Sequence, residues 1–132
     1  VELDKEMAKL MIDEYPILSI AASFAETPSI FRGLKELKIK ESNRLELIYQ
    51  NLNRCGVRAE VKDDDLYIYP NKEYAIKDSN IITKFDHRIA MAFSVMGTRL
   101  NKDLKILESE CINTSFPNFF KSFNSVGGKL IE

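Results

Sequence analysis

The stretch that decides the fold of this 132-residue chain reads Lys40-Glu41-Ser42-Asn43-Arg44. It is followed by apolar residues at helical spacing, Leu45, Ile48 and Leu52. The pattern predicts the polar start of an amphipathic helix, and in helical geometry Lys40, Glu41 and Arg44 share one surface. Because a helix N-terminus already favours anions, cations gathered there indicate a bound anion, with Glu41 placed to give or take a proton. The alternative is a solvated first turn with an exposed ion pair.

The composition is typical of one globular domain that has almost no net charge. The net charge is −1, so we expect no nucleic-acid partner and no membrane partner, and any anion site must be built locally. The longest apolar stretch, residues 17–25, is too short to cross a bilayer, and no signal peptide is visible. Cys55 and Cys111 are isolated thiols of the kind found reduced in the cytoplasm. With one histidine, His87, neither a metal nor a cofactor is expected.

Four segments are predicted to be helices that begin with polar residues: at Asp13, at Lys40, at Asp86 and at Thr114-Ser115. Short β-prone runs lie between and after them, at residues 30–31, 57–61, 66–69, 104–107 and 129–131. Asp63-Asp64-Asp65 indicates a hairpin turn. Residues 70–82 are polar and turn-rich and form the candidate linker.

The two halves of the chain repeat one pattern of helix, strand, loop, helix and strand. Asp13 is matched by Asp86 and Lys40 by Thr114, at a nearly constant separation. We therefore expect an α/β (α+β) fold of two similar units, residues 1–72 and 73–132. Such a repeat would place the four polar helix starts on one side of the sheet, where their N-termini would form an anion site.

The candidate functional residues are the polar residues at these starts: Asp13, Lys40, Glu41, Arg44, Asp86, His87, Arg88, Thr114 and Ser115. Carboxylates and cations alternate among them, as expected for a site that binds phosphate or carboxylate and also moves protons. Arg44 and Arg88 have the planar donor fork suited to either anion. For Asp86 the simpler interpretation is a helix cap.

Four strings at fitting spacing carry a family resemblance: M-I-D-E-Y-P-I-L at 11–18, K-E-S-N-R-L at 40–45, D-H-R-I-A-M-A-F at 86–93 and T-S-F-P-N-F at 114–119. Over residues 11–131 the chain resembles the EPSP synthase (3-phosphoshikimate 1-carboxyvinyltransferase) family. The resemblance implies βαβαββ units of the enolpyruvyl transferase fold, about two of which are present. It also implies a shikimate-pathway transferase that moves the enolpyruvyl group of phosphoenolpyruvate to the 5-hydroxyl of shikimate 3-phosphate.

Residue roles follow from the same resemblance. Asp13 would contact the ring hydroxyl of shikimate 3-phosphate as proton acceptor, and Lys40 would contact the same substrate. Glu41 would exchange a proton with the enolpyruvyl methylene carbon. Arg44 and Arg88 would clamp phosphoenolpyruvate. The supporting residues would be Asp86, His87, Thr114 and Ser115, with His87 orienting a neighbour rather than acting as a base.

The chain departs from the family pattern in two places and covers only part of it. Asn43 stands where many members carry Asp, and Thr114 where some carry a phosphate-binding Lys. The chain starts at Val1, and residues that the family uses in its N-terminal segments have no match here. We therefore expect a C-terminal portion, with weak anion binding, no turnover alone, and self-association through an exposed face.

Two other interpretations stay open beside this one. The chain can be a non-catalytic α/β module from a broken gene that binds phosphorylated small molecules weakly. It can also belong to the sister enolpyruvyl transferase that acts on UDP-N-acetylglucosamine, although K-E-S-N-R and D-H-R-I-A-M fit the shikimate enzyme better.

Overall fold

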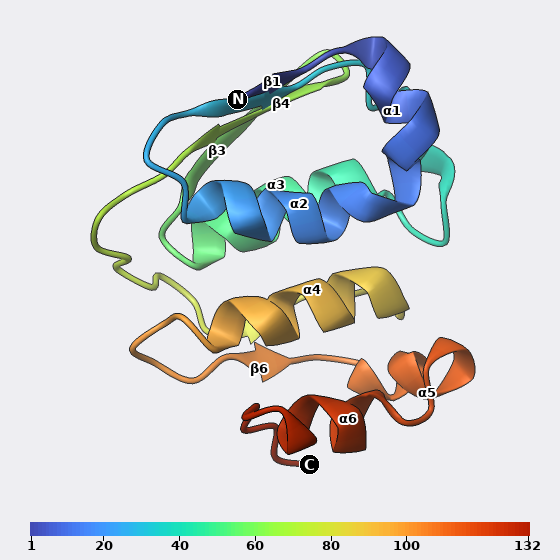
Figure 1. Ribbon diagram of the computed structural model, residues 1–132, viewed down its shortest axis with the longest axis vertical. Coiled ribbons are helices and arrows are strands. Elements are labelled where there is room, and N and C mark those ends of the chain that lie inside the picture. The colour runs from blue at the N-terminus through green and yellow to red at the C-terminus, as the bar shows by residue number, and fades with distance from the viewer.

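Residues 2–69 form a four-stranded sheet with helices on one face (Figure 1). The computed structural model describes all 132 residues. The elements of this first unit are β1 (Glu2–Leu3), α1 (Lys5–Met11), α2 (Tyr15–Ser23), β2 (Ser29–Phe31), α3 (Arg44–Arg54), β3 (Arg58–Lys62) and β4 (Asp65–Tyr69). The strand order is β1-β2-β4-β3, with β1 parallel to β2 and the other two pairs antiparallel. The hairpin between β3 and β4 turns at Asp63, as predicted.

Residues 80–125 form a smaller second unit with its own two-stranded parallel sheet. Its elements are β5 (Asn80–Ile81), α4 (His87–Gly97), β6 (Lys105–Ile106), α5 (Ile112–Ser115) and α6 (Phe119–Ser125). In Figure 1, α4 lies between the helices of the first unit and β6. With α1 and α2 counted as one helical segment, and α5 and α6 as another, the first unit has the order βαβαββ and the second has βαβα. This confirms the predicted α/β fold of repeated units. The boundary between residues 72 and 73 stays a prediction.

The core lies where the helices of the first unit meet its sheet and α4. Alternation along β4 explains the packing, because Leu66 and Ile68 are fully buried while Tyr67 between them faces outward. Ile48 of α3 and Phe93 of α4 are also fully buried. Near this core the Asn51 amide donates to the main-chain oxygen of Ile82 (2.7 Å) and accepts from its N–H (3.0 Å), which fastens α3 to the second unit. None of the helices has the length and apolar run needed to cross a bilayer.

Three of the predicted helix starts are wrong in detail. Asp13 caps nothing: it lies in a 3-10 turn, Ile12–Glu14, and its carboxylate bonds to cations instead. Lys40 ends another 3-10 helix, Lys35–Ile39, and α3 begins only at Arg44, because the Asn43 side chain accepts the Glu46 N–H and caps the helix there.

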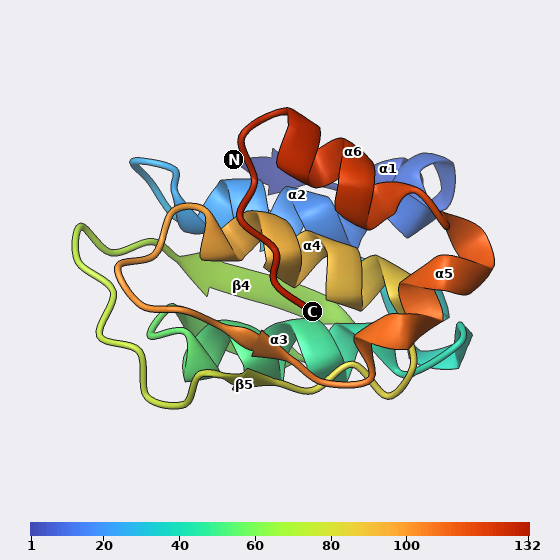
Figure 2. The same ribbon diagram turned by 90° about the horizontal axis from the view of Figure 1, so that it is seen from below.

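The prediction at Thr114-Ser115 is also wrong, because these residues end α5 rather than begin a helix. The Thr114 hydroxyl donates back to the main-chain oxygen of Cys111, at 2.7 Å, and it accepts no N–H from a following turn. The predicted strand at 129–131 is absent, because the Asn124 side chain occupies the N–H and C=O of Leu130. In Figure 2 the chain returns from α6 as an irregular tail.

The sequence prediction missed β1, α1 and β5, the last of which lies inside the candidate linker. Asp86, by contrast, caps α4 as expected, accepting the N–H groups of Arg88 and Ile89. It is brought into position by a turn at Lys84 and Phe85, both in the left-handed region with φ of 48° and 59°. Two consecutive non-glycine residues with positive φ are uncommon, and no pattern in the sequence predicted this turn.

Candidate functional site

Three segments that are distant in sequence meet at one edge of the helical layer. They are the 3-10 turn that carries Asp13, the irregular segment 40–43 (hereafter loop 40–43) with the start of α3, and the start of α4 at Asp86. Six polar side chains connect them: Asp13, Lys40, Glu41, Ser42, Arg44 and Asp86. We call these six residues the carboxylate–arginine cluster. The predicted convergence of helix starts is therefore found for two helices, α3 and α4.

Arg44 is the centre of this cluster, and its side chain is only 1% exposed. Its Nε donates to Asp86 Oδ2 at 2.8 Å and its Nη1 to Asp13 Oδ1 at 3.0 Å, while Nη2 donates to Glu41. A guanidinium buried at this depth needs such compensation, since removing its charge from water without a partner is strongly unfavourable. Each of its three nitrogens thus has a carboxylate acceptor.

Asp86 is the second buried member, with a fully buried side chain. Its Oδ1 accepts the N–H of Arg88 at 3.0 Å and that of Ile89 at 3.4 Å. Its Oδ2 accepts both Arg44 Nε and the Ser42 hydroxyl, each at 2.8 Å. Four donors therefore surround this one carboxylate. The cap interpretation is correct for Oδ1 and incomplete for the residue as a whole.

Asp13 lies nearer to solvent, with 42% of its side chain exposed. Its Oδ1 is 3.4 Å from Lys40 Nζ as well as 3.0 Å from Arg44. Burial alone would raise the pKa of its carboxyl, but the hydrogen bond and charge of Lys40, with the charges of Arg88 and Arg44, outweigh burial and lower that pKa below its usual range. Arg88 also donates to the main-chain oxygen of Asp13, at 3.0 Å.

The groups that remain accessible decide what the cluster can do chemically. Glu41 is 53% exposed, and Lys40 and Arg88 are partly exposed. A groove of about 230 Å³ between α2 and α4 is lined by Asp13, Arg88 and apolar residues that include Met91. The arrangement therefore presents two accessible carboxylates, on Asp13 and Glu41, next to two accessible cations. Such a set can bind an anion and exchange protons beside it.

Four predicted residues lie outside the cluster. Arg88 borders it through its hydrogen bond to the main-chain oxygen of Asp13, and the other three make no polar contact with it. The His87 side chain forms no hydrogen bond and no ion pair, although it stands between Asp86 and Arg88. Thr114 bonds only to Cys111, and Ser115 is exposed. Ser42 is the cluster residue that sequence reasoning missed. Its position inside the charged stretch could have indicated a role, because a hydroxyl there can donate a hydrogen bond to a buried carboxylate.

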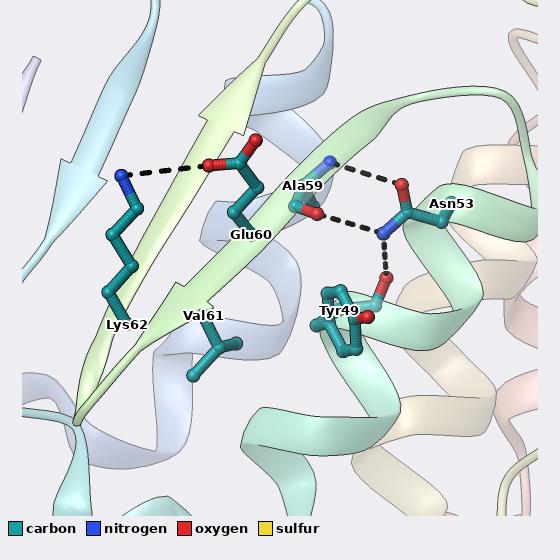
Figure 3. Close-up of a pocket in the computed structure, with 6 residues that line it drawn as sticks. All are labelled: Tyr49, Asn53, Ala59, Glu60, Val61 and Lys62. Atoms are coloured by element: carbon teal, nitrogen blue, oxygen red, sulfur yellow. Dashed lines mark hydrogen bonds and ion pairs between the residues drawn. The ribbon is translucent and has the colours of Figure 1, made fainter.

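A larger hollow, of about 460 Å³, lies between α3 and β3 and contains none of the cluster residues (Figure 3). Figure 3 shows the Asn53 amide paired with both main-chain groups of Ala59, at 3.3 Å and 3.0 Å. The charged residues there, Glu60 and Lys62, pair with each other at 3.8 Å. Because no unpaired charged group points into it, this hollow is a poorer candidate for chemistry than the cluster.

Comparisons with known proteins point to one family. The family model described as EPSP synthase (3-phosphoshikimate 1-carboxyvinyltransferase) matches residues 2–123. Proteins named 3-phosphoshikimate 1-carboxyvinyltransferase are 44% identical to this chain in Paramagnetospirillum magneticum and 42% identical in Methylobacterium radiotolerans. Each match covers 98% of this chain and 29% of the relative. The solved structure of EPSP synthase from Acinetobacter baumannii superposes with a TM-score of 0.88 at 31% identity, over 98% of this chain and 30% of that one.

Proposed function

Because this chain belongs to the EPSP synthase family, we propose that its cluster is one wall of the site that transfers the enolpyruvyl group of phosphoenolpyruvate to shikimate 3-phosphate. The single observation that carries the proposal is the meeting of Asp13, Lys40, Glu41 and Arg44 at one point, from segments far apart in sequence. These are the residues to which the family resemblance assigns substrate contact and proton transfer. The sister enzyme acting on UDP-N-acetylglucosamine is not favoured, since the relatives carry the shikimate enzyme's name.

The geometry supports a division of roles among these residues. Asp13, held ionised by Lys40 and Arg44, would accept the proton of the 5-hydroxyl of shikimate 3-phosphate, and Lys40 would bind the same substrate. Glu41, the most exposed carboxylate of the cluster, would exchange the proton of the methylene carbon. Arg88 would bind phosphoenolpyruvate with Arg44. Arg44 would do so by exchanging one of its present carboxylate partners for that of the ligand.

The rest of the site would come from segments outside this chain. The chain spans about 29% of the length of the curated relatives it matches. We propose that it corresponds to their C-terminal portion, that N-terminal segments form the opposite wall, and that the enzyme works in the cytoplasm. Alone, the chain would bind the two substrates weakly and turn nothing over, because water exclusion and orientation need both walls.

Self-association of the isolated chain is part of the same proposal. The apolar side chains of Phe116, Val126 and Ile131 are 43%, 83% and 93% exposed, all within the last seventeen residues. Exposed apolar side chains of this size favour contact between copies. Sedimentation of the chain would reveal it.

The test is Glu41→Gln in the protein expressed from its complete coding sequence. Removing a positioned general acid or base lowers turnover about 10²–10⁴-fold, and we expect kcat to fall by this factor with little change in either KM. The matched control is Glu36→Gln, an exposed glutamate without a partner in the preceding 3-10 helix. Near-normal turnover of Glu41→Gln would remove the proton-transfer role. If the unsubstituted protein binds both ligands without turnover, the chain is a non-catalytic module instead.

A further inference from the structure

Loop 40–43 carries two of the proposed functional side chains, yet it belongs to no helix or strand. Lys40 ends a 3-10 helix, and α3 begins at Arg44. A segment without regular structure has few hydrogen bonds of its own to fix its backbone, so its side chains must be held by contacts elsewhere. Ser42 supplies such a contact, because its hydroxyl donates to Asp86 Oδ2 at 2.8 Å across 44 residues of sequence.

Asp86 is suited to hold the loop because it is itself immobilised. Its Oδ1 is fixed by two N–H groups of the first turn of α4, and its side chain has no contact with solvent. Its Oδ2 therefore occupies a defined position at the end of a rigid, eleven-residue helix. Water cannot replace a lost donor at such a buried oxygen without rearrangement of its surroundings.

Ser42 and Arg44 reach this same oxygen from positions two residues apart in the chain. Arg44 Nε also donates to it at 2.8 Å, and the Arg44 N–H bonds to the Ser42 main-chain oxygen at 3.0 Å. The two side chains and the intervening backbone thus form a closed hydrogen-bonded ring with one carboxylate oxygen. Such a ring fixes the direction in which Glu41, next to Ser42, leaves the loop.

We propose that Ser42 and Asp86 are positioning residues of the transfer reaction: through one shared carboxylate oxygen they hold Arg44 and loop 40–43, and so the proton-transfer group of Glu41. The proposal rests on the proposed function above. Neither residue is assigned contact with a substrate. A purely structural role makes a different prediction, since Oδ1 alone would cap α4 and the loop would keep its order without Ser42.

The first test compares Ser42→Ala with Ser42→Thr, which keeps the hydroxyl, in the protein expressed from its complete coding sequence. The control is Ser125→Ala, an exposed serine bonded to a neighbouring main-chain oxygen in α6. Misplacement of a catalytic group by about 1 Å lowers turnover roughly 10²-fold. We expect Ser42→Ala to lower kcat by about 10- to 100-fold with little change in either KM, and Ser42→Thr to recover most of the loss. Unchanged kcat in Ser42→Ala overturns the proposal.

A second measurement does not depend on activity. Backbone ¹⁵N relaxation of residues 40–43 should show lower order parameters in Ser42→Ala than in the parent, Ser42→Thr or Ser125→Ala. Equal order parameters in all four proteins overturn the positioning role even if kcat falls. A third outcome is that Ser42→Ala increases the mobility of residues 40–43 while the parent protein shows no turnover. That outcome supports the link to Asp86 and overturns the proposed function. The failure of the positioning role and the failure of the proposed function are therefore distinguishable.

Asp86→Asn separates the two oxygens of the carboxylate. Asparagine caps helices as well as aspartate does, so the oxygen can stay on the N–H groups of Arg88 and Ile89. The amide NH₂ then faces two donors where Oδ2 accepted them. The Ser42 hydroxyl can rotate to accept, but Arg44 Nε cannot. We expect a larger loss of kcat than in Ser42→Ala, with α4 intact by backbone chemical shifts. Full activity in this variant overturns the role of Oδ2.

Discussion

The two units of this molecule start alike and end differently. In each, a short strand leads through one or two helices to a second strand that is parallel to the first. The first unit then continues through α3 into the hairpin of β3 and β4, whereas the second continues through α5 and α6 into a tail that pairs with no strand. Burial follows the same division, because no residue after Ile112 is buried.

This difference indicates which parts of the chain contribute most of its stability and which parts form the candidate site. The first unit has a four-stranded sheet and supplies most residues of the main buried core. The second unit contributes α4, whose buried face and capping Asp86 are packed against the first unit. The cluster lies at this junction, where Arg44 of one unit meets Asp86 of the other. A site between two units can use both to exclude water from the buried charges.

The largest expected effect comes from breaking the charged contact between the units. Arg44→Met removes the guanidinium but keeps an unbranched stem in place of the aliphatic part of the side chain, and it leaves Asp86 buried without its cation. Loss of one partner of a buried pair costs about 3–5 kcal/mol, and we expect the free energy of unfolding to fall by this amount in urea titrations. The control is Arg58→Met, whose pair with Glu60 is exposed and should contribute little to the free energy of unfolding. Equal losses would mean that the junction is no more than a surface contact.

A smaller effect distinguishes the cores of the two units. Ile48 in α3 is fully buried, while Phe123 in α6 is partly exposed and stacks on Phe119 with ring centroids 5.3 Å apart. Ile48→Ala should cost about 2–5 kcal/mol, because deletion of buried methyl groups leaves a cavity. Phe123→Ala removes a larger side chain, yet it should cost less. A larger loss for Phe123→Ala in the same unfolding experiment would show that the second unit has a core of its own.

The smallest effect is the pH dependence of the stability that Asp13 contributes through its contacts with cations of both units. Its pKa is lowered from 3.8 in the folded state, so its contribution to stability is fully present above about pH 4 and is lost as the pH falls through the folded-state pKa. The stability difference between the parent and Asp13→Asn should therefore shrink below pH 4. A difference that stays constant from pH 7 to pH 2 would mean that the pKa of Asp13 is not lowered. The difference between the two pH-dependent unfolding curves reports Asp13 together with the charged groups that it contacts.

Local patterns predicted those parts of the structure that depend on neighbours in sequence. The helical spacing after Arg44 and Ile89, the hairpin at Asp63 and the cap at Asp86 all follow from residues within one or two turns. The errors occurred where a side chain bonded to a different partner from the one that the local pattern assigned to it, near or distant in sequence. Asp13 bonds to Lys40 and Arg44 rather than to its own helix, and Asn124 takes the main-chain groups of Leu130 that would have formed a strand.

The sequence by itself determined the α/β class, the repeat, the family and most of the charged residues of the site, because spacing and residue type carry this information locally. Only the tertiary structure decided what the stretch from Lys40 to Arg44 does. Residues 40–43 form a loop that leads into α3 at Arg44, and Ser42 and Arg44 tie this loop to a carboxylate of the other unit. The physical reason is that a buried charge needs a partner within hydrogen-bonding distance, because burying it unpaired is strongly unfavourable. The fold decides which residues come that close, and the spacing of residues in the sequence does not show it.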